Sequence, residues 1–185
     1  MSIRENLQKV EESIAKSAAV SGRKAEDVTL IAVSKTIDVE RILEAYEAGA
    51  RQLGENRVQE MMGKQPQLPP DIGWHLIGQL QKNKVKYIID KVKLVHSLCS
   101  LSVAQEMQRL LEKRDTALDC LIEINIAGEE TKSGLSKQEL PEMCIRDSII
   151  ILPMKTAKLP AWICTVKIWM AETWLAILLL RGSKS

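Results

Sequence analysis

The stretch VTLIAVSK, residues 28 to 35, is a short run of apolar and β-branched residues that ends in a lysine. Polar and apolar residues do not alternate along it, which is typical of a strand buried on both faces in a parallel sheet. Parallel sheets hold reactive side chains where their strands end and loops begin. The stretch therefore predicts a buried strand, with Lys35 at the edge where functional groups collect.

Strands and helices alternate on both sides of this stretch. An amphipathic helix is predicted over residues 2–20, and Asp38 can cap a second helix that Gly49 ends. Further strands are predicted at residues 52–57, 73–80, 93–100 and 118–128, and further helices at 58–64, 82–91 and 102–115, the last opened by Ser102. This alternation predicts parallel βαβ units around one sheet. About five units are too few to close an eight-stranded barrel of about 250 residues, so the fold is an incomplete barrel or a small α/β sheet.

The composition is that of a single globular domain. The 185 residues are 45% hydrophobic, and the net charge of +2 is too small for a protein that binds nucleic acid over its whole surface. The four cysteines show neither a CxxC pair nor a metal-type spacing with the two histidines, and no charged-then-apolar leader opens the chain. We expect a reduced, cytoplasmic protein without a metal site.

Polar residues stand at the predicted strand ends, and Lys35 is the most informative of them. A lysine at the lip of an apolar strand is expected to be partly desolvated, which favours the neutral amine that attacks aldehydes. An ordinary lysine that solubilises a strand end fits the same pattern. Asn56 fits either a neighbour of a bound group or a cap of the following turn. His75 lies inside an apolar run, where a hydrogen-bonded structural histidine is common, and Lys132 precedes a Ser-Gly pair.

Four segments resemble one family in their order and spacing: LIAVSKT (30–36), GENRVQE (54–60), WHLIGQLQKNK (74–84) and LIEINIAGEETKSG (121–134). Over residues 1 to about 142 the chain resembles the pyridoxal phosphate homeostasis proteins, also called the proline synthase co-transcribed family. The resemblance implies a (β/α)8 TIM-barrel type of α/β fold like the N-terminal domain of alanine racemase, here incomplete. It implies that Lys35 carries pyridoxal 5'-phosphate as a Schiff base. We count Asn56, His75 and Lys132 as further cofactor-binding candidates, with Lys132 able to accept the cofactor from Lys35.

The function implied by the resemblance is intracellular homeostasis of pyridoxal phosphate without catalysis. A first alternative, a racemase or decarboxylase, requires a second acid or base across the cofactor. The two tyrosines that could serve, Tyr46 and Tyr87, fall in predicted helices. A second alternative is an RNA- or protein-interaction module that uses the lysine-rich helix 81–93, although a solvated helix face explains those lysines better. We expect a monomer whose partner is the small-molecule cofactor, with no membrane and no nucleic acid.

The resemblance ends near residue 142. The family continues into three more strands, with an S-M-G-M-S loop and a V-R-I-G segment that supply phosphate-binding amides and an arginine, and neither occurs in residues 143–185. MCIRDS (143–148) resembles a translated sequencing-library adapter, so we interpret the atypical tail as out-of-frame sequence. A genomic read that passes through this junction in frame would contradict that interpretation. The apolar part of the tail is too short to span a membrane. It is expected either to pack irregularly against an open sheet edge or to expose surface and promote association.

Overall fold

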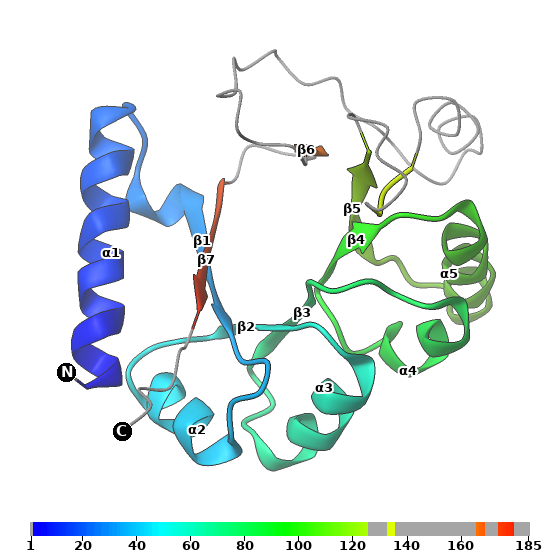
Figure 1. The fold of residues 1–185 in the computed structure, drawn as a ribbon, viewed down its shortest axis with the longest axis horizontal. Coiled ribbons are helices and arrows are strands. Elements are labelled where there is room, and N and C mark those ends of the chain that lie inside the picture. Colours follow the sequence, from blue (N-terminus) through cyan, green and yellow to red (C-terminus); the bar gives the residue numbers. More distant parts are fainter. Residues whose placement is uncertain (1, 126–132, 136–165, 169–173, 180–185) are drawn as a thin grey trace. The chain divides into compact units, whose positions relative to one another are not determined.

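The computed structural model describes residues 2–125, 133–135, 166–168 and 174–179. The chain divides into two compact units: unit 1 is residues 1–75 with 172–185, and unit 2 is residues 76–171. Both units contain parallel strands connected through helices, as the alternation of the sequence predicts (Figure 1).

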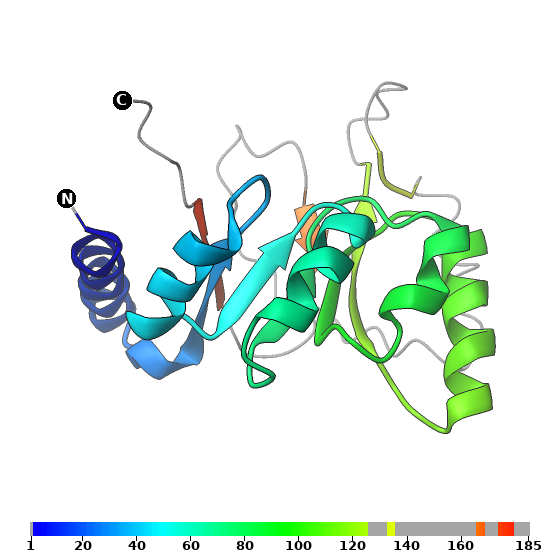
Figure 2. The same ribbon diagram turned by 90° about the horizontal axis from the view of Figure 1, so that it is seen from below.

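Unit 1 has its strands in the order β3-β2-β1-β7. Its elements are α1 (Ile3–Val20), η1 (Ala25–Asp27), β1 (Val28–Val33), α2 (Val39–Glu47), β2 (Gln52–Glu55), α3 (Val58–Lys64), η2 (Gln65–Gln67), β3 (Gly73–Leu76, at the boundary with unit 2) and β7 (Trp174–Leu179). Strands β1 and β2 run parallel, with Ala32 opposite Leu53 and Val33 opposite Gly54. Figure 2 shows α2 and α3 side by side on the same face of these two strands.

The second half of β1 lies in the core of unit 1, as predicted from the apolar run. Ile31, Ala32 and Val33 are each at most 2% exposed, whereas the first three residues of the strand are half-buried. Full burial of an aliphatic side chain contributes about 1.5–3 kcal/mol to stability. Burial continues to Ser34 and ends at Lys35, so the chain leaves the core between these two residues.

Side-chain caps set the starts of α1 and α2. Ser2 Oγ accepts a hydrogen bond from Glu5 N–H at 3.2 Å, and Glu5 Oε2 accepts one from Ser2 N–H at 3.0 Å, which is a capping box. Asp38 Oδ1 accepts from Arg41 N–H at 2.9 Å, so the predicted cap of α2 is confirmed. Helix α2 ends before Gly49, whose φ of 119° few other residues adopt.

Unit 2 contains η3 (Lys82–Lys84), α4 (Val85–Ile88), β4 (Leu94–Leu98), α5 (Leu101–Arg114), β5 (Asp119–Ile124) and β6 (Val166–Ile168). Strands β4 and β5 are parallel, as predicted. The single helix predicted over 82–91 is wrong: a 3₁₀ turn precedes one α-helical turn, and the α-helical turn buries Val85 and Ile88. Helix α5 begins one residue before the predicted Ser102. Its N-cap is Ser100, whose hydroxyl bonds to that of Ser102 at 2.8 Å.

The tail contributes two strands that the sequence does not predict. Strand β7 pairs in parallel with β1 over six residues, from Val28 opposite Trp174 to Val33 opposite Leu179. Strand β6 pairs antiparallel with β5. The expectation of irregular packing is therefore wrong at these two places, because an edge strand offers unpaired N–H and C=O groups to any extended segment. The MCIRDS segment lies outside the described residues.

Neither membrane spans nor metal clusters occur in the described part of the chain. None of its helices is both long enough and apolar enough to cross a bilayer. Within the same residues, no group of three or more His, Cys, Asp or Glu side chains is arranged to hold a metal ion. Cys99 and Cys120 are half-buried free thiols.

Candidate functional site

Lys35 lies in a tight turn directly after β1. The turn is closed by a hydrogen bond from Ile37 N–H to the carbonyl of Ser34, at 3.1 Å. Thr36 has a φ of 62° in this turn, in the left-handed region that a β-branched residue rarely adopts. Its hydroxyl donates to the Lys35 carbonyl at 2.6 Å. Residues held in such conformations collect at functional sites, so the backbone marks this turn as a candidate.

Lys35 is exposed, and the partial desolvation expected of its amine stays a prediction. The turn carries Lys35 out of the apolar strand, whereas Ser34, the residue before it, is completely buried. An exposed primary amine is open to a ligand in solution, and lysine amines form Schiff bases with aldehydes. Position and access, rather than burial, make Lys35 a candidate attachment point.

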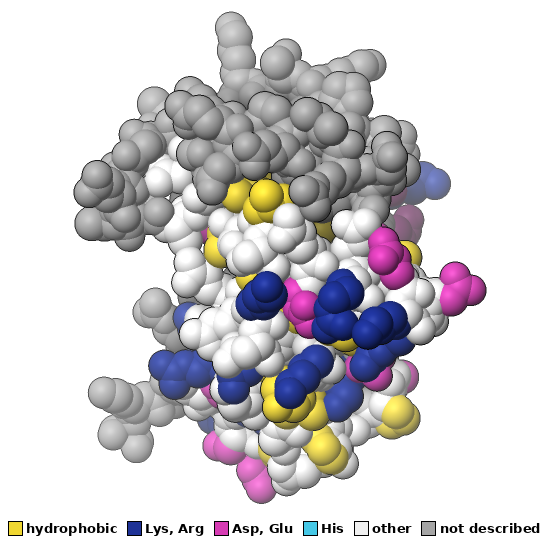
Figure 3. Space-filling model, turned by 90° about the vertical axis from the view of Figure 1, so that its right-hand side faces the viewer, with side chains coloured by type: hydrophobic (Ala, Val, Ile, Leu, Met, Phe, Trp, Pro, Cys, Tyr) yellow, Lys and Arg dark blue, Asp and Glu magenta, His cyan; other side chains and the backbone are white. Residues whose placement is uncertain are grey.

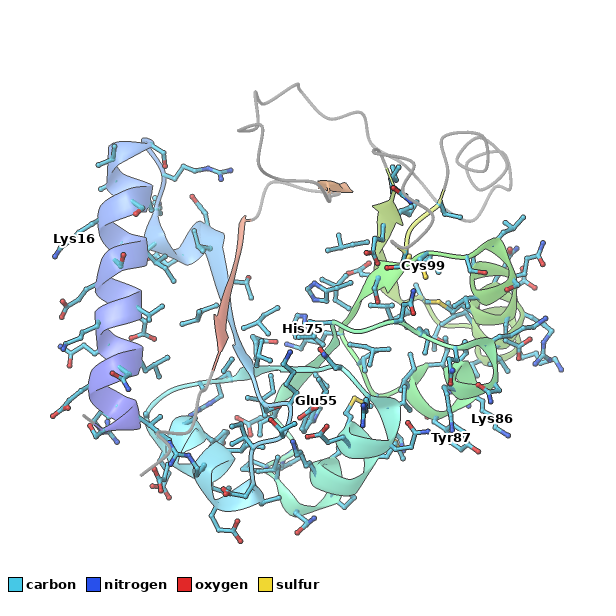
Figure 4. All side chains as sticks on the ribbon, viewed as in Figure 1. Lys16, Glu55, His75, Lys86, Tyr87 and Cys99 are labelled. Atoms are coloured by element: carbon cyan, nitrogen blue, oxygen red, sulfur yellow. The ribbon has the colours of Figure 1, made fainter. Side chains whose placement is uncertain are left out.

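Asn56 directly follows β2, and His75 lies within β3, the next strand in the chain. Asn56 is half-buried. It does not cap α3, because the N-cap is Arg57, which makes no side-chain cap bond. His75 is 5% exposed on β3, and its Nε2 is 3.0 Å from Gln52 Oε1, as expected for a hydrogen-bonded structural histidine. Figure 4 labels His75 together with Glu55, which ends β2.

A buried polar cluster joins the end of β1 to β2 and α3. We call it the Lys64 cluster, and its members are Ser34, Glu55, Glu60 and Lys64. Lys64 Nζ donates to the Ser34 carbonyl at 2.7 Å, to Glu55 Oε1 at 2.8 Å and to Glu60 Oε1 at 2.7 Å. Because an ammonium has three N–H donors, these three acceptors use all of them. Ser34 Oγ donates to Glu55 Oε1 at 2.7 Å, which closes the cluster.

The two carboxyl groups of the cluster have pKa values shifted in opposite directions. Glu55 is fully buried, and the loss of solvation raises its pKa despite the hydrogen bonds from Lys64 and Ser34. Desolvation also opposes the ionisation of Glu60, but hydrogen bonds from Lys64 and from Thr36 N–H outweigh it and lower the pKa of Glu60. Glu60 is therefore the carboxylate that stays ionised most readily beside Lys64.

The sequence reasoning missed the Lys64 cluster. One signal of it is visible in GENRVQEMMGK (54–64), where Glu60 and Lys64 are four residues apart, the spacing of an ion pair on one helix face. Ser34 and Glu55 come from different strands, so no local pattern connects them to Lys64.

Lys132 lies outside the described residues, but the segment directly after it is described. Leu135 N–H donates to the Glu123 carbonyl at 2.8 Å, and Asn125 N–H donates to the Leu135 carbonyl at 2.9 Å, so this segment runs beside the end of β5. Gly134 has a φ of 125°, and a Cβ atom there would lie 2.7 Å from Asn125 N, which only glycine avoids. The transfer role of Lys132 stays a prediction.

Basic side chains gather on the face of unit 2 that carries η3, α4 and α5 (Figure 3). Lys82 and Lys86 are exposed there, whereas Val85 and Ile88 are buried, so the lysines of this segment face solvent and its apolar residues face the core. Lys86 Nζ lies 5.0 Å from the ring centre of Tyr87, which is itself 44% exposed.

The family model for the alanine racemase N-terminal domain matches residues 3–147 of this chain. A pyridoxal phosphate homeostasis protein of Aquifex aeolicus is 44% identical over 140 residues, which cover 75% of this chain and 61% of the relative. This chain thus spans about three fifths of the length of that relative.

Two solved structures are similar in both sequence and fold. PipY of Synechococcus elongatus, solved with pyridoxal phosphate bound, is 33% identical with a TM-score of 0.58, and the match covers 71% of this chain and 64% of PipY. An unknown protein from Bifidobacterium adolescentis is 32% identical with a TM-score of 0.65, and the match covers 77% of this chain and 62% of that protein. These matches confirm the predicted fold class, an incomplete α/β barrel of the TIM type. A pyridoxal phosphate homeostasis protein of Pasteurella multocida is 33% identical, and the match covers 84% of this chain and 72% of that relative. The chain belongs to the alanine racemase N-terminal domain family and, within it, to the pyridoxal phosphate homeostasis proteins.

Proposed function

We propose that this chain binds pyridoxal phosphate, takes part in its intracellular homeostasis, and attaches it through Lys35. The observation that carries the proposal is the exposed amine of Lys35, presented by a strained turn at the carboxyl end of β1. PipY, a similar protein, was solved with this cofactor bound, which supports the proposal. Lys35 Nζ would hold the cofactor, which would supply the aldehyde group that a primary amine attacks with loss of one water molecule.

The remaining candidates are proposed to act around this amine. Asn56 and His75 follow Lys35 on the next two strands of unit 1, and a half-buried amide such as Asn56 can hydrogen-bond a polar cofactor. The bond between His75 and Gln52 holds the imidazole in one orientation. Lys132 is proposed as a second amine that takes over the cofactor. We expect this attachment to be weak and reversible, because the phosphate-binding segments implied by the family are not in this sequence.

We propose a carrier rather than a catalyst. A racemase would need a second acid or base, and Tyr46 is engaged elsewhere: its hydroxyl donates to Asp71 Oδ1 at 2.8 Å. That hydrogen bond, more than its small loss of solvation, raises the pKa of Tyr46, because the carboxylate disfavours a phenolate beside it. A phenol with a raised pKa is ionised even less at neutral pH, so less phenolate is present to act as a base. Release of a racemised or decarboxylated amino acid would overturn this part of the proposal.

The test is a titration with pyridoxal phosphate that compares Lys35→Ala with Lys16→Ala. Lys16 is an exposed lysine on α1 and serves as the matched control (Figure 4). We expect the wild-type chain and Lys16→Ala to develop the visible absorbance of the attached cofactor, and Lys35→Ala to lose it. After borohydride reduction, peptide mass spectrometry should place the adduct on Lys35. A wild-type chain that stays colourless, or an adduct mainly on another lysine, would overturn the proposal.

A further inference from the structure

The Lys64 cluster holds the backbone on both sides of Lys35. Before Lys35, the Ser34 carbonyl accepts from Lys64 Nζ, and the Ser34 hydroxyl donates to Glu55. After Lys35, Thr36 N–H donates to Glu60 Oε1 at 2.5 Å. The same Glu60 oxygen accepts from Lys64 at 2.7 Å, so one carboxylate connects the buried ammonium to the turn.

The turn needs an external partner because its conformation is unfavourable. A threonine at a φ of 62° has its branched side chain close to its own backbone. Strain of this kind persists only where surrounding contacts fix the backbone. Two bonds within the turn contribute: Ile37 N–H to the Ser34 carbonyl, and Thr36 Oγ1 to the Lys35 carbonyl. The Thr36 N–H itself points to Glu60, on α3.

Glu60 does more here than balance the charge of Lys64. Glu55 also lies against Lys64, at 2.8 Å, and it is completely buried. Glu60 differs from Glu55 in reaching out of the cluster to the main chain of Thr36. Its hydrogen bonds from Lys64 and Thr36 lower its pKa although desolvation acts in the opposite direction, so the acceptor at Thr36 is charged.

We propose that Glu60 is a positioning residue, which keeps the turn of residues 34–37 in the strained conformation that presents the Lys35 amine. This inference rests on the proposed function in one respect, namely that Lys35 is the attachment point. The holding of the turn itself requires no cofactor. Without the Glu60 carboxylate, Thr36 should relax toward a common backbone conformation, and the amine should lose its fixed position.

The experiment compares Glu60→Ala with Glu60→Gln in the full 185-residue chain. Glutamine keeps a neutral acceptor oxygen and serves as the conservative rescue, while Glu40→Gln on the exposed face of α2 is the matched control. The first readout is the hydrogen exchange of the Ile37 amide by NMR. This amide closes the turn without touching Glu60. The Ala50 amide, which bonds to the Ala45 carbonyl at 2.9 Å, is the internal reference for general unfolding.

In Glu60→Ala we expect the Ile37 amide to exchange about tenfold faster or more, because the strained turn is no longer held by a charged acceptor, with Ala50 unchanged. Glu60→Gln should fall between Glu60→Ala and the wild type. In a Thr36→Gly background the strain is absent, so Glu60→Ala should then change Ile37 exchange only slightly. Unchanged Ile37 exchange in Glu60→Ala, or an equal increase with and without Thr36→Gly, would overturn the inference.

The second readout is the concentration of pyridoxal phosphate that gives half-maximal absorbance. We expect this concentration to rise about tenfold in Glu60→Ala. In a Thr36→Gly background, Glu60→Ala should raise it much less, parallel to the exchange data. If faster Ile37 exchange leaves the titration unchanged, Glu60 does not position Lys35 and the inference is overturned. A wild-type chain that shows no absorbance contradicts the attachment at Lys35, and the Ile37 exchange still decides whether Glu60 holds the turn.

Discussion

Lys35 and Lys64 lie in opposite environments, although both border the same turn. Lys35 is exposed, whereas Lys64 is 9% exposed and has its three N–H donors bonded to three oxygens. A buried ammonium without acceptors is strongly destabilised, so the cluster around Lys64 is a condition of folding. The exposed amine of Lys35 has no such requirement and stays open to a ligand. The extensive hydrogen bonding in this region is therefore made by Lys64, and the proposed attachment is at Lys35.

The thiol of Cys120 should react slowly with alkylating reagents in the folded chain. Burial in β5, together with the neighbouring Asp119 carboxylate, raises the pKa of Cys120 to about 11. Alkylation by iodoacetamide requires the thiolate. At pH 9 we therefore expect Cys120 to react on the order of 50-fold more slowly in the folded chain than in urea, with the rate still rising toward pH 11. Peptide mass spectrometry of chains quenched at successive pH values measures this.

The pH dependence, not the absolute rate, decides the Cys120 prediction, since burial also blocks the reagent. The same pKa shift makes the stability of the folded chain depend on pH. The folded thiol keeps its proton to higher pH than the unfolded one, so any stability linked to Cys120 is present below about pH 8.5 and is lost toward pH 11. A rate profile for the folded chain with its midpoint near pH 8.5 would contradict the shift.

The elements of unit 1 follow local sequence rules, which is why they could be predicted. The apolar run of β1, the Asp38 cap and the stop at Gly49 each act within a few residues. The segment after Gln81 was mispredicted because a 3₁₀ turn followed by one α-helical turn buries apolar residues at nearly the same spacing as a longer helix.

The candidate site was only partly predictable. Lys35 stays a prediction: its place after a recognisable strand fits an ordinary lysine as well, and the resemblance of four segments to the family singles it out. The left-handed conformation of the next residue, Thr36, could not be read from the sequence, because threonine gives no signal for it. The Lys64 cluster was missed because Ser34, Glu55 and Lys64 meet only when β1, β2 and α3 pack together.

The Asp38 cap of α2 should contribute measurably to the free energy of unfolding. Asp38 Oδ1 accepts from Arg41 N–H, and replacing such a cap by alanine costs about 0.5–2 kcal/mol. We expect Asp38→Ala to lower the free energy of unfolding by that amount and Asp38→Ser to retain most of it, as measured by urea denaturation. The control is Glu40→Ala, on the exposed face of the same helix. Equal losses in Asp38→Ala and Asp38→Ser would show that the cap bond is not the cause.

The family model matches most of the chain but not its C-terminal tail. The family match stops at residue 147, close to the change in composition at residue 143, which supports the proposal that the tail is not the continuation of the family domain. A barrel closes by pairing its first strand with its last, so β1 requires a neighbour on its outer edge. Here β7 occupies that edge in a six-residue parallel ladder (Figure 1).

Removing residues 172–185, which carry β7, should therefore change the association state of the chain. The outer edge of β1 would then present unpaired N–H and C=O groups, and such an edge pairs with another chain. We expect the shortened chain to associate more strongly with rising concentration in sedimentation velocity, while the 185-residue chain does not. A charged side chain on the edge, introduced as Thr29→Lys in the shortened chain, should suppress the association. A shortened chain that stays folded by circular dichroism and does not associate would show that β7 does not protect this edge.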